Sequence, residues 1–76
     1  MPVILRFGAF KFVIYPKDHL PAHVHVLAPN AEAKVDSQSG KSVAVFGFSQ
    51  KTVKRLAEIT SKNRELLMEA WHEFQD

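Results

Sequence analysis

The sequence contains no cysteine, which excludes disulfide bonds and zinc sites built on thiolates. Its 76 residues are enough for one domain, which we assign to residues 1–76. A domain of this size buries only about 60% of the surface that its unfolded chain exposes. Because no disulfide supports so small a core, the usual remaining support is a homodimer or a partner chain.

Long hydrophobic runs are also absent. No stretch approaches the roughly 20 apolar residues that a membrane helix needs. Residues 1–6 lack the basic leader of a signal peptide, and Arg6 interrupts their apolar run. These features predict a cytoplasmic protein with no membrane partner.

The sequence has no large excess of charge of either sign, since its net charge is only +2. Its distribution is uneven, however. Residues 1–55 hold eight Lys or Arg and three acidic residues, whereas residues 56–76 hold two and five. A basic half with an acidic tail can orient a polyanion or a protein partner. An ordinary solvated surface explains the same distribution, so charge alone does not indicate nucleic-acid binding.

What the sequence does have, in its first half, is alternation with a period of two. The alternating segments are residues 3–7, 10–15, 23–28, 31–36 and 41–46. Glycine, proline and asparagine separate most of them, as turns require. The pattern predicts an antiparallel sheet of four or five strands over about residues 3–46.

The second half changes period. Apolar residues recur at spacings of three and four from Val53 to Phe74, and Ser49 is a suitable N-cap. The pattern predicts one helix, or two with a kink near Thr60, over residues 49–75. We expect Trp71 in the core. The helical part should pack on one sheet face, giving an α+β fold.

The opposite face of that sheet is expected to stay open. It would carry polar residues of reactive types: Arg6, Lys11, Tyr15, His23, His25, Glu32 and Lys34. We expect His72, on the helical part, to be an ordinary surface residue.

The segment Asp18-His19-Leu20-Pro21-Ala22-His23-Val24-His25 is the most chemically distinctive part of the chain. His23 and His25 lie two residues apart on an expected strand, so their rings should point to the same side. If the Pro29-Asn30 pair forms a two-residue turn, His25 lies opposite Lys34, and His23 lies opposite Asp36.

Three interpretations of this segment remain open. The first is a metal site, zinc being the natural ion, with His19, His23 and His25 as ligands and Asp18 as a substitute ligand. The second is acid–base cleavage of a phosphodiester. There, the catalytic residues would be His23, His25, His19, Asp18 and Tyr15, and the phosphate- or substrate-binding residues would be Arg6, Lys34 and Glu32. The third is a structural or partner-binding role for the histidines.

Several short motifs along the chain resemble those of a known family. These motifs are Pro2-x-Ile4-Leu5-Arg6, Tyr15-x-x-Asp18-His19-x-Pro21-x-His23-Val24-His25-Val26, Glu32-Ala33-Lys34, Gly47-Phe48-Ser49 and Asn63-Arg64-Glu65-Leu66-Leu67 before Ala70-Trp71. Together they span nearly the whole chain and resemble the DUF4160 family of small bacterial and mobile-element proteins.

The resemblance implies that the protein acts together with a partner protein, and it assigns no reaction. Members of that family often accompany a second small domain, DUF2442, in an arrangement like a toxin–antitoxin pair. We therefore expect a component of such a module, acting on RNA or another phosphorylated target through the histidine-rich face. The alternatives are a non-catalytic protein-binding module, including a homodimer, and a metal-binding protein.

Overall fold

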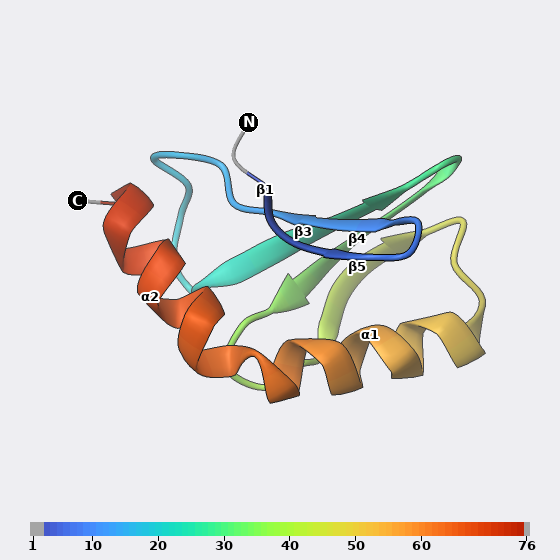
Figure 1. The fold of residues 1–76 in the computed structure, drawn as a ribbon. Coiled ribbons are helices and arrows are strands. Elements are labelled where there is room, and N and C mark those ends of the chain that lie inside the picture. Colours follow the sequence, from blue (N-terminus) through green and yellow to red (C-terminus); the bar gives the residue numbers. More distant parts are fainter. Residues whose placement is uncertain (1–2, 76) are drawn as a thin grey trace.

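The protein folds as a five-stranded antiparallel sheet followed by two helices, in a computed structural model that describes residues 3–75 (Figure 1). The strands pair in sequence order, so each one neighbours the next along the chain. They are β1 (Val3–Phe7), β2 (Phe10–Val13), β3 (His23–Ala28), β4 (Ala31–Asp36) and β5 (Ser42–Phe46). The α+β prediction is confirmed, with five strands.

The hairpin between β3 and β4 has the predicted register. His23 pairs with Asp36, and His25 pairs with Lys34. Asn30 in the connecting turn has a φ of 62°, a left-handed conformation that asparagine adopts more readily than most residues. The turn therefore fixes which residues of β3 share a face.

The helical part consists of two helices, α1 (Gln50–Lys62) and α2 (Arg64–Gln75), which are separated at Asn63. The Oγ atom of Ser49 accepts a hydrogen bond from the Thr52 amide at 3.2 Å, as the N-cap prediction required. The side chain of Asn63 donates to the Ile59 carbonyl oxygen at 2.8 Å, and such local bonds favour helix ends. The break comes after Thr60, which is buried inside α1.

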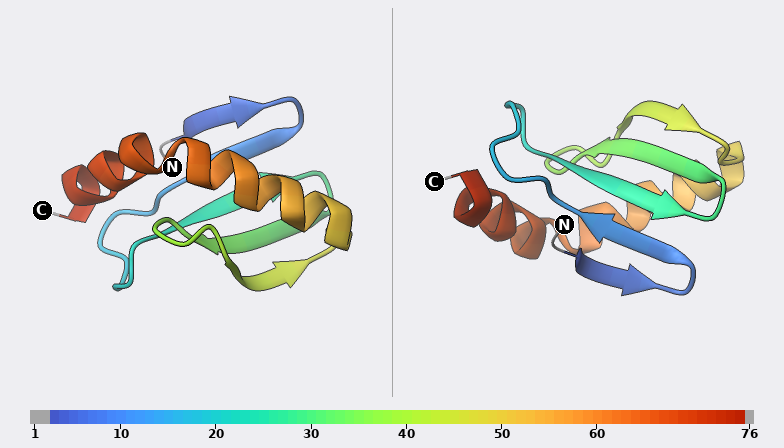
Figure 2. Two further views of the ribbon diagram at one scale, coloured as in Figure 1. Left: turned by 90° about the horizontal axis from the view of Figure 1, so that it is seen from below. Right: turned by 90° about the horizontal axis from the view of Figure 1, so that it is seen from above.

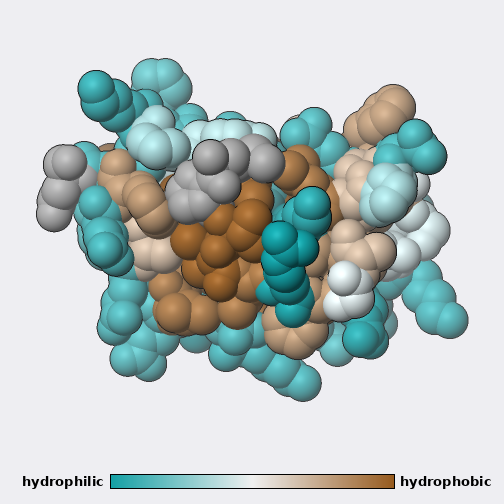
Figure 3. All heavy atoms as spheres, turned by 45° about the horizontal axis from the view of Figure 1, so that its top comes forward, coloured by the Kyte–Doolittle hydropathy of each residue, from teal (hydrophilic) through white to brown (hydrophobic). Residues whose placement is uncertain are grey.

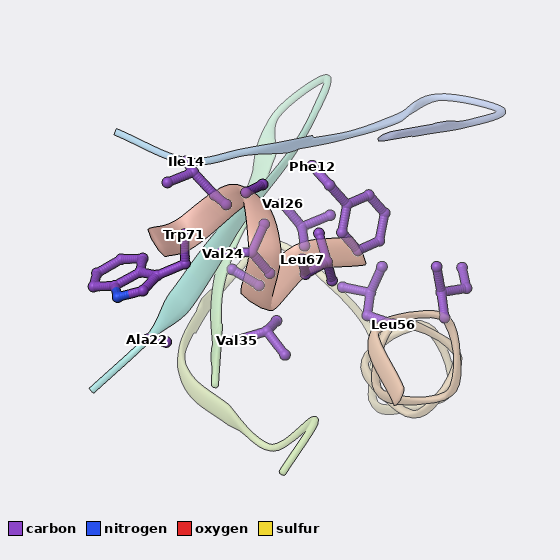
Figure 4. Packing of buried hydrophobic residues seen from close by; sticks show 12 residues of the cluster. Phe12, Ile14, Ala22, Val24, Val26, Val35, Leu56, Leu67 and Trp71 are labelled. Atoms are coloured by element: carbon purple, nitrogen blue, oxygen red, sulfur yellow. The ribbon is translucent and has the colours of Figure 1, made fainter. Parts of the chain in front are cut away.

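The core lies between the sheet and the helices. Val24, Val26 and Val35 are fully buried on the helix-facing side of β3 and β4. They form one cluster with Leu56 of α1 and with Leu67 and Trp71 of α2 (Figure 4). The alternation of the strands and the three-four spacing of the helices therefore meet in one apolar layer.

The helices leave the other sheet face open. Seen from above, the strands lie in front of the helices, and α2 extends beyond one end of the sheet, near residues 14–22 (Figure 2). An oblique view of this side shows apolar residues grouped together and bordered by hydrophilic ones (Figure 3). Within residues 3–75, neither helix is long and apolar enough to cross a membrane.

Candidate functional site

The candidate site forms where residues 14–22 connect β2 to β3. This connection brings Asp18 back over the first residues of β3, beside α2. Two prolines, Pro16 and Pro21, stiffen it. The site is therefore built from one loop carboxylate and two strand histidines that are held by the sheet register.

One carboxylate oxygen of Asp18 meets both histidines. Its Oδ2 atom lies 2.8 Å from Nε2 of His23 and 3.5 Å from Nε2 of His25. The other oxygen, Oδ1, accepts a hydrogen bond from the His19 amide at 2.9 Å. The nitrogen atoms of two rings thus converge on a single oxygen atom. We call Asp18, His23 and His25 the Asp–His–His cluster.

His23 has an acceptor on each side of its ring. Its Nδ1 atom lies 2.9 Å from the carbonyl oxygen of Pro21, and its Nε2 atom faces Asp18. A carbonyl oxygen can only accept, so Nδ1 must carry a hydrogen. A neutral imidazole has only one N–H, which leaves a lone pair on Nε2 pointing at a carboxylate oxygen. This contact needs a cation: either a proton shared by the two atoms, or a metal ion that lies beside them and is bound by both.

The charge on Asp18 is favoured by its neighbours. Burial acts to raise the pKa of this carboxyl group, but the hydrogen bonds from the His19 amide and from the His23 and His25 rings outweigh it. The pKa of Asp18 therefore lies below its ordinary value, and the group is an anion at neutral pH.

Aromatic rings fix both histidines. The Tyr15 ring lies edge-on to His25 at a centroid distance of 4.6 Å, and the Trp71 ring lies 5.1 Å from His23. His23 is only 3% exposed, so the expectation that its side of the strand is in water is wrong at this residue. The side chain of His25 is 19% exposed. The cluster is thus enclosed at His23 and open to solvent at His25.

The three residues can supply the ligands of one metal ion. The candidate ligand atoms of Asp18, His23 and His25 all lie within 4.8 Å of one another. Ligands of a tetrahedral zinc ion are separated by roughly 3.3 Å, a spacing that follows from metal–ligand distances of 2.0–2.1 Å. The observed separations of 2.8 and 3.5 Å bracket that value.

His19 is the predicted ligand that the structure leaves outside. Its side chain is exposed, and it is not one of the three residues that can meet around one ion within residues 3–75. Its backbone amide, rather than its ring, contributes to the site by holding Asp18. Asp18 thus occupies the position predicted for His19.

Of the predicted phosphate-binding residues, Lys34 lies nearest to the cluster. It pairs with His25 in the β3–β4 register. Both line a shallow hollow of about 270 Å³ on the open face, together with Glu32, Ala33, Ala44, Val45 and Phe46. Arg6 instead pairs with Lys11 across β1 and β2 and lines a different hollow, which contains no residue of the cluster.

Two contributors to the site were missed in the sequence. The Pro21 carbonyl oxygen sets the proton position on His23, and Trp71 covers its ring. Every residue has a backbone carbonyl, so the sequence does not indicate which one accepts this hydrogen bond. The helical spacing of Trp71 predicted only that it is buried.

Neither the curated proteins nor the solved structures include a match to this chain. A family model does match, over residues 9–72. Its description is a domain of unknown function, and the matched range includes the whole Asp–His–His cluster and Trp71. Since this range covers most of the chain, the protein belongs to the DUF4160 family.

Proposed function

We propose that the Asp–His–His cluster binds a divalent metal ion, zinc being the best fit, and that the protein uses it to cleave phosphodiester bonds in RNA. In this proposal the protein is a cytoplasmic component of a toxin–antitoxin-type module, and its partner is a small protein of the DUF2442 kind. The carrying observation is the convergence of Nε2 of His23 and Nε2 of His25 on one anionic oxygen of Asp18, at 2.8 and 3.5 Å, while Nδ1 of His23 faces a carbonyl oxygen.

The hydrogen bond from Nδ1 of His23 to the Pro21 carbonyl oxygen suits a metal ligand. Metal-binding histidines usually donate their second ring N–H to a carbonyl or carboxylate, which fixes the tautomer and the ring orientation. His25 completes the set with a third ligand atom. Three protein ligands leave one coordination position free, as catalytic zinc sites require.

The open side of the cluster suits an RNA phosphate. Bound zinc would neutralise charge on the phosphate and lower the pKa of a coordinated water molecule to about 7. Lys34, opposite His25, would bind a non-bridging phosphate oxygen. The 2′-hydroxyl would give its proton to a hydroxide ion from solvent, and its oxygen would form a bond to phosphorus. The bond between phosphorus and the 5′-oxygen would break, and the 5′-oxygen would take a proton from water, producing a 2′,3′-cyclic phosphate and a 5′-hydroxyl.

A second candidate follows from the same contact. If a proton takes the place of the metal, His23 is a doubly protonated imidazolium paired with Asp18. His25, which is partly exposed, is then the base that accepts the 2′-hydroxyl proton. This acid–base reaction uses the same residues but needs no metal, and so the two candidates differ in their response to a chelator.

The test combines metal binding with RNA cleavage. The protein freed of metal by a chelator is titrated with zinc in a calorimeter and then assayed on total RNA. We expect one zinc ion per chain and cleavage that is lost with the chelator and restored by zinc. His25→Ala should abolish both. The matched control His19→Ala, an exposed histidine outside the cluster, should retain both.

Other outcomes assign the function differently. Cleavage that survives the chelator but is lost in His25→Ala establishes the acid–base candidate. Zinc binding without cleavage reduces the proposal to a metal-binding protein. If neither occurs, the proposal is wrong, and a protein-binding module remains. Induced expression in bacteria tests the toxin role: growth arrest by the unchanged protein, absent in His25→Ala, supports it.

A further inference from the structure

A second hollow adjoins the cluster, on the side of Asp18. It has a volume of about 480 Å³ and is lined by Lys17, Asp18, Leu20, Trp71, His72 and Gln75. Two segments far apart in the sequence form it, the connection between β2 and β3 and the last turns of α2. Because Asp18 belongs to both the hollow and the cluster, a molecule bound in this hollow lies next to a residue of the cluster.

Specific contacts hold the two segments in place. The side-chain amide of Gln75 donates a hydrogen bond to the Tyr15 carbonyl oxygen at 3.1 Å. Trp71, only 2% exposed, packs its ring on His23. The shape of the hollow is therefore set by the same side chain that covers the cluster.

Lys17 is held in an unfavourable backbone conformation at this hollow. Its φ is 60°, in the left-handed region that strains a residue with a side chain. Such conformations concentrate at functional sites. The side chain of Lys17 is exposed, and within residues 3–75 it forms no salt bridge. Its charge is thus available to a ligand.

The remaining lining residues fit a nucleotide. His72 is exposed and can exchange hydrogen bonds with a phosphate or sugar oxygen. Leu20 is 79% exposed, which gives the hollow an apolar edge against which a base or ribose can pack. A cation, a hydrogen-bonding ring and an apolar edge lie together next to a cluster suited to phosphodiesters.

We infer that this hollow is the subsite for the nucleotide next to the cleaved bond of a single-stranded RNA. Lys17 binds its phosphate, His72 hydrogen-bonds to it, and Leu20 contacts the base or ribose. All three are substrate-binding residues. The inference deepens the proposed function and rests on it for the substrate class.

Two of the other hollows that contain cations are poorer candidates for this role. One contains Arg6 and Lys11, and the other contains Lys51, Lys54 and Arg55 of α1. Neither is lined by a residue of the Asp–His–His cluster. Lys54 therefore provides a matched control, since it is an exposed lysine in a hollow of similar size.

The only tryptophan of the chain reports on the subsite. Trp71 lines the hollow, so a ligand that enters it should change the fluorescence of the protein. The probe is a short single-stranded RNA with 2′-O-methyl groups, which cannot supply the attacking 2′-hydroxyl. We expect saturable quenching. Lys17→Ala should weaken binding about tenfold, as the loss of a charge-assisted hydrogen bond predicts, and His72→Ala should weaken it less.

Controls separate the subsite from general attraction to a polyanion. Lys17→Arg should bind like the unchanged protein, and Lys17→Gly, which relieves the backbone strain, should still bind weakly. Lys54→Ala should stay within about twofold. The inference is overturned if Lys54→Ala weakens binding as much as Lys17→Ala, or if the probe neither binds nor quenches Trp71.

The subsite and the proposed function can fail separately. On cleavable RNA, Lys17→Ala should raise KM and leave kcat and zinc affinity nearly unchanged. If cleavage depends on zinc but Lys17→Ala leaves KM unchanged, the subsite alone is overturned. Probe binding that depends on Lys17, in a protein without zinc binding or cleavage, supports the subsite and overturns the proposed function.

Discussion

His23 and Val24 are neighbours on β3 and are both enclosed, yet they point to opposite faces of the sheet and are enclosed differently. Val24 is buried among apolar side chains of the core, where apolar contacts suffice. His23 is buried by a tryptophan ring and by acceptors on both ring nitrogens, where every polar atom needs a partner. Burial on the first face therefore serves stability alone, whereas burial on the second serves stability and also fixes the chemistry of one side chain.

His23→Ala should be the most damaging change on this strand. It removes a buried ring and leaves the partially buried Asp18 and the Pro21 carbonyl oxygen without their partner. We expect a loss of about 3 kcal/mol in the free energy of unfolding, measured by urea denaturation. A loss within about 0.5 kcal/mol would show that His23 is enclosed without contributing to stability.

Val24→Ala tests the contribution of the core face of β3 to stability. The loss of two buried carbons and the cavity left behind should cost about 2 kcal/mol, with zinc affinity unchanged. Val43→Ala is the matched control, because Val43 is 64% exposed on β5, and it should change stability by less than about 0.5 kcal/mol. Equal losses in the two valine variants would contradict the difference in burial.

The core face was predictable from the sequence, and the enclosure of the histidine face was not. Alternation along residues 23–28 and the spacing of the helices fixed which side of β3 meets α1 and α2. The two-residue turn at Pro29-Asn30 correctly paired His25 with Lys34. The position of Asp18, by contrast, depends on how residues 14–22 fold back over the strand, and periodicity says nothing about an irregular connection.

Acid should weaken the turn beyond β4, at the end of the sheet where the cluster lies. Backbone hydrogen bonds from Ser39 and Gln38 hold the pKa of Asp36 below its ordinary value. Its charged form therefore adds stability above the pKa of about 3.9 for an unfolded aspartate, and this contribution is lost as the pH falls through the lower folded value. In metal-free protein, thermal melting should show less of this acid-induced loss in Asp36→Asn. A pH dependence unchanged by that variant would exclude Asp36 as a cause.

His25→Ala should have the smallest effect on stability and sharpens the comparison most. His25 lies on the same face as His23 and two residues away, but its side chain is 19% exposed and its bond to Asp18 is long, at 3.5 Å. We expect a change within about 0.5 kcal/mol in metal-free protein, together with the loss of zinc binding. Since His23→Ala should lose both properties, the pair of variants separates the histidine that the fold needs from the one that only the site needs. A large loss of stability in His25→Ala would mean that both histidines are structural, and the case for a site would then rest on zinc binding by the unchanged protein alone.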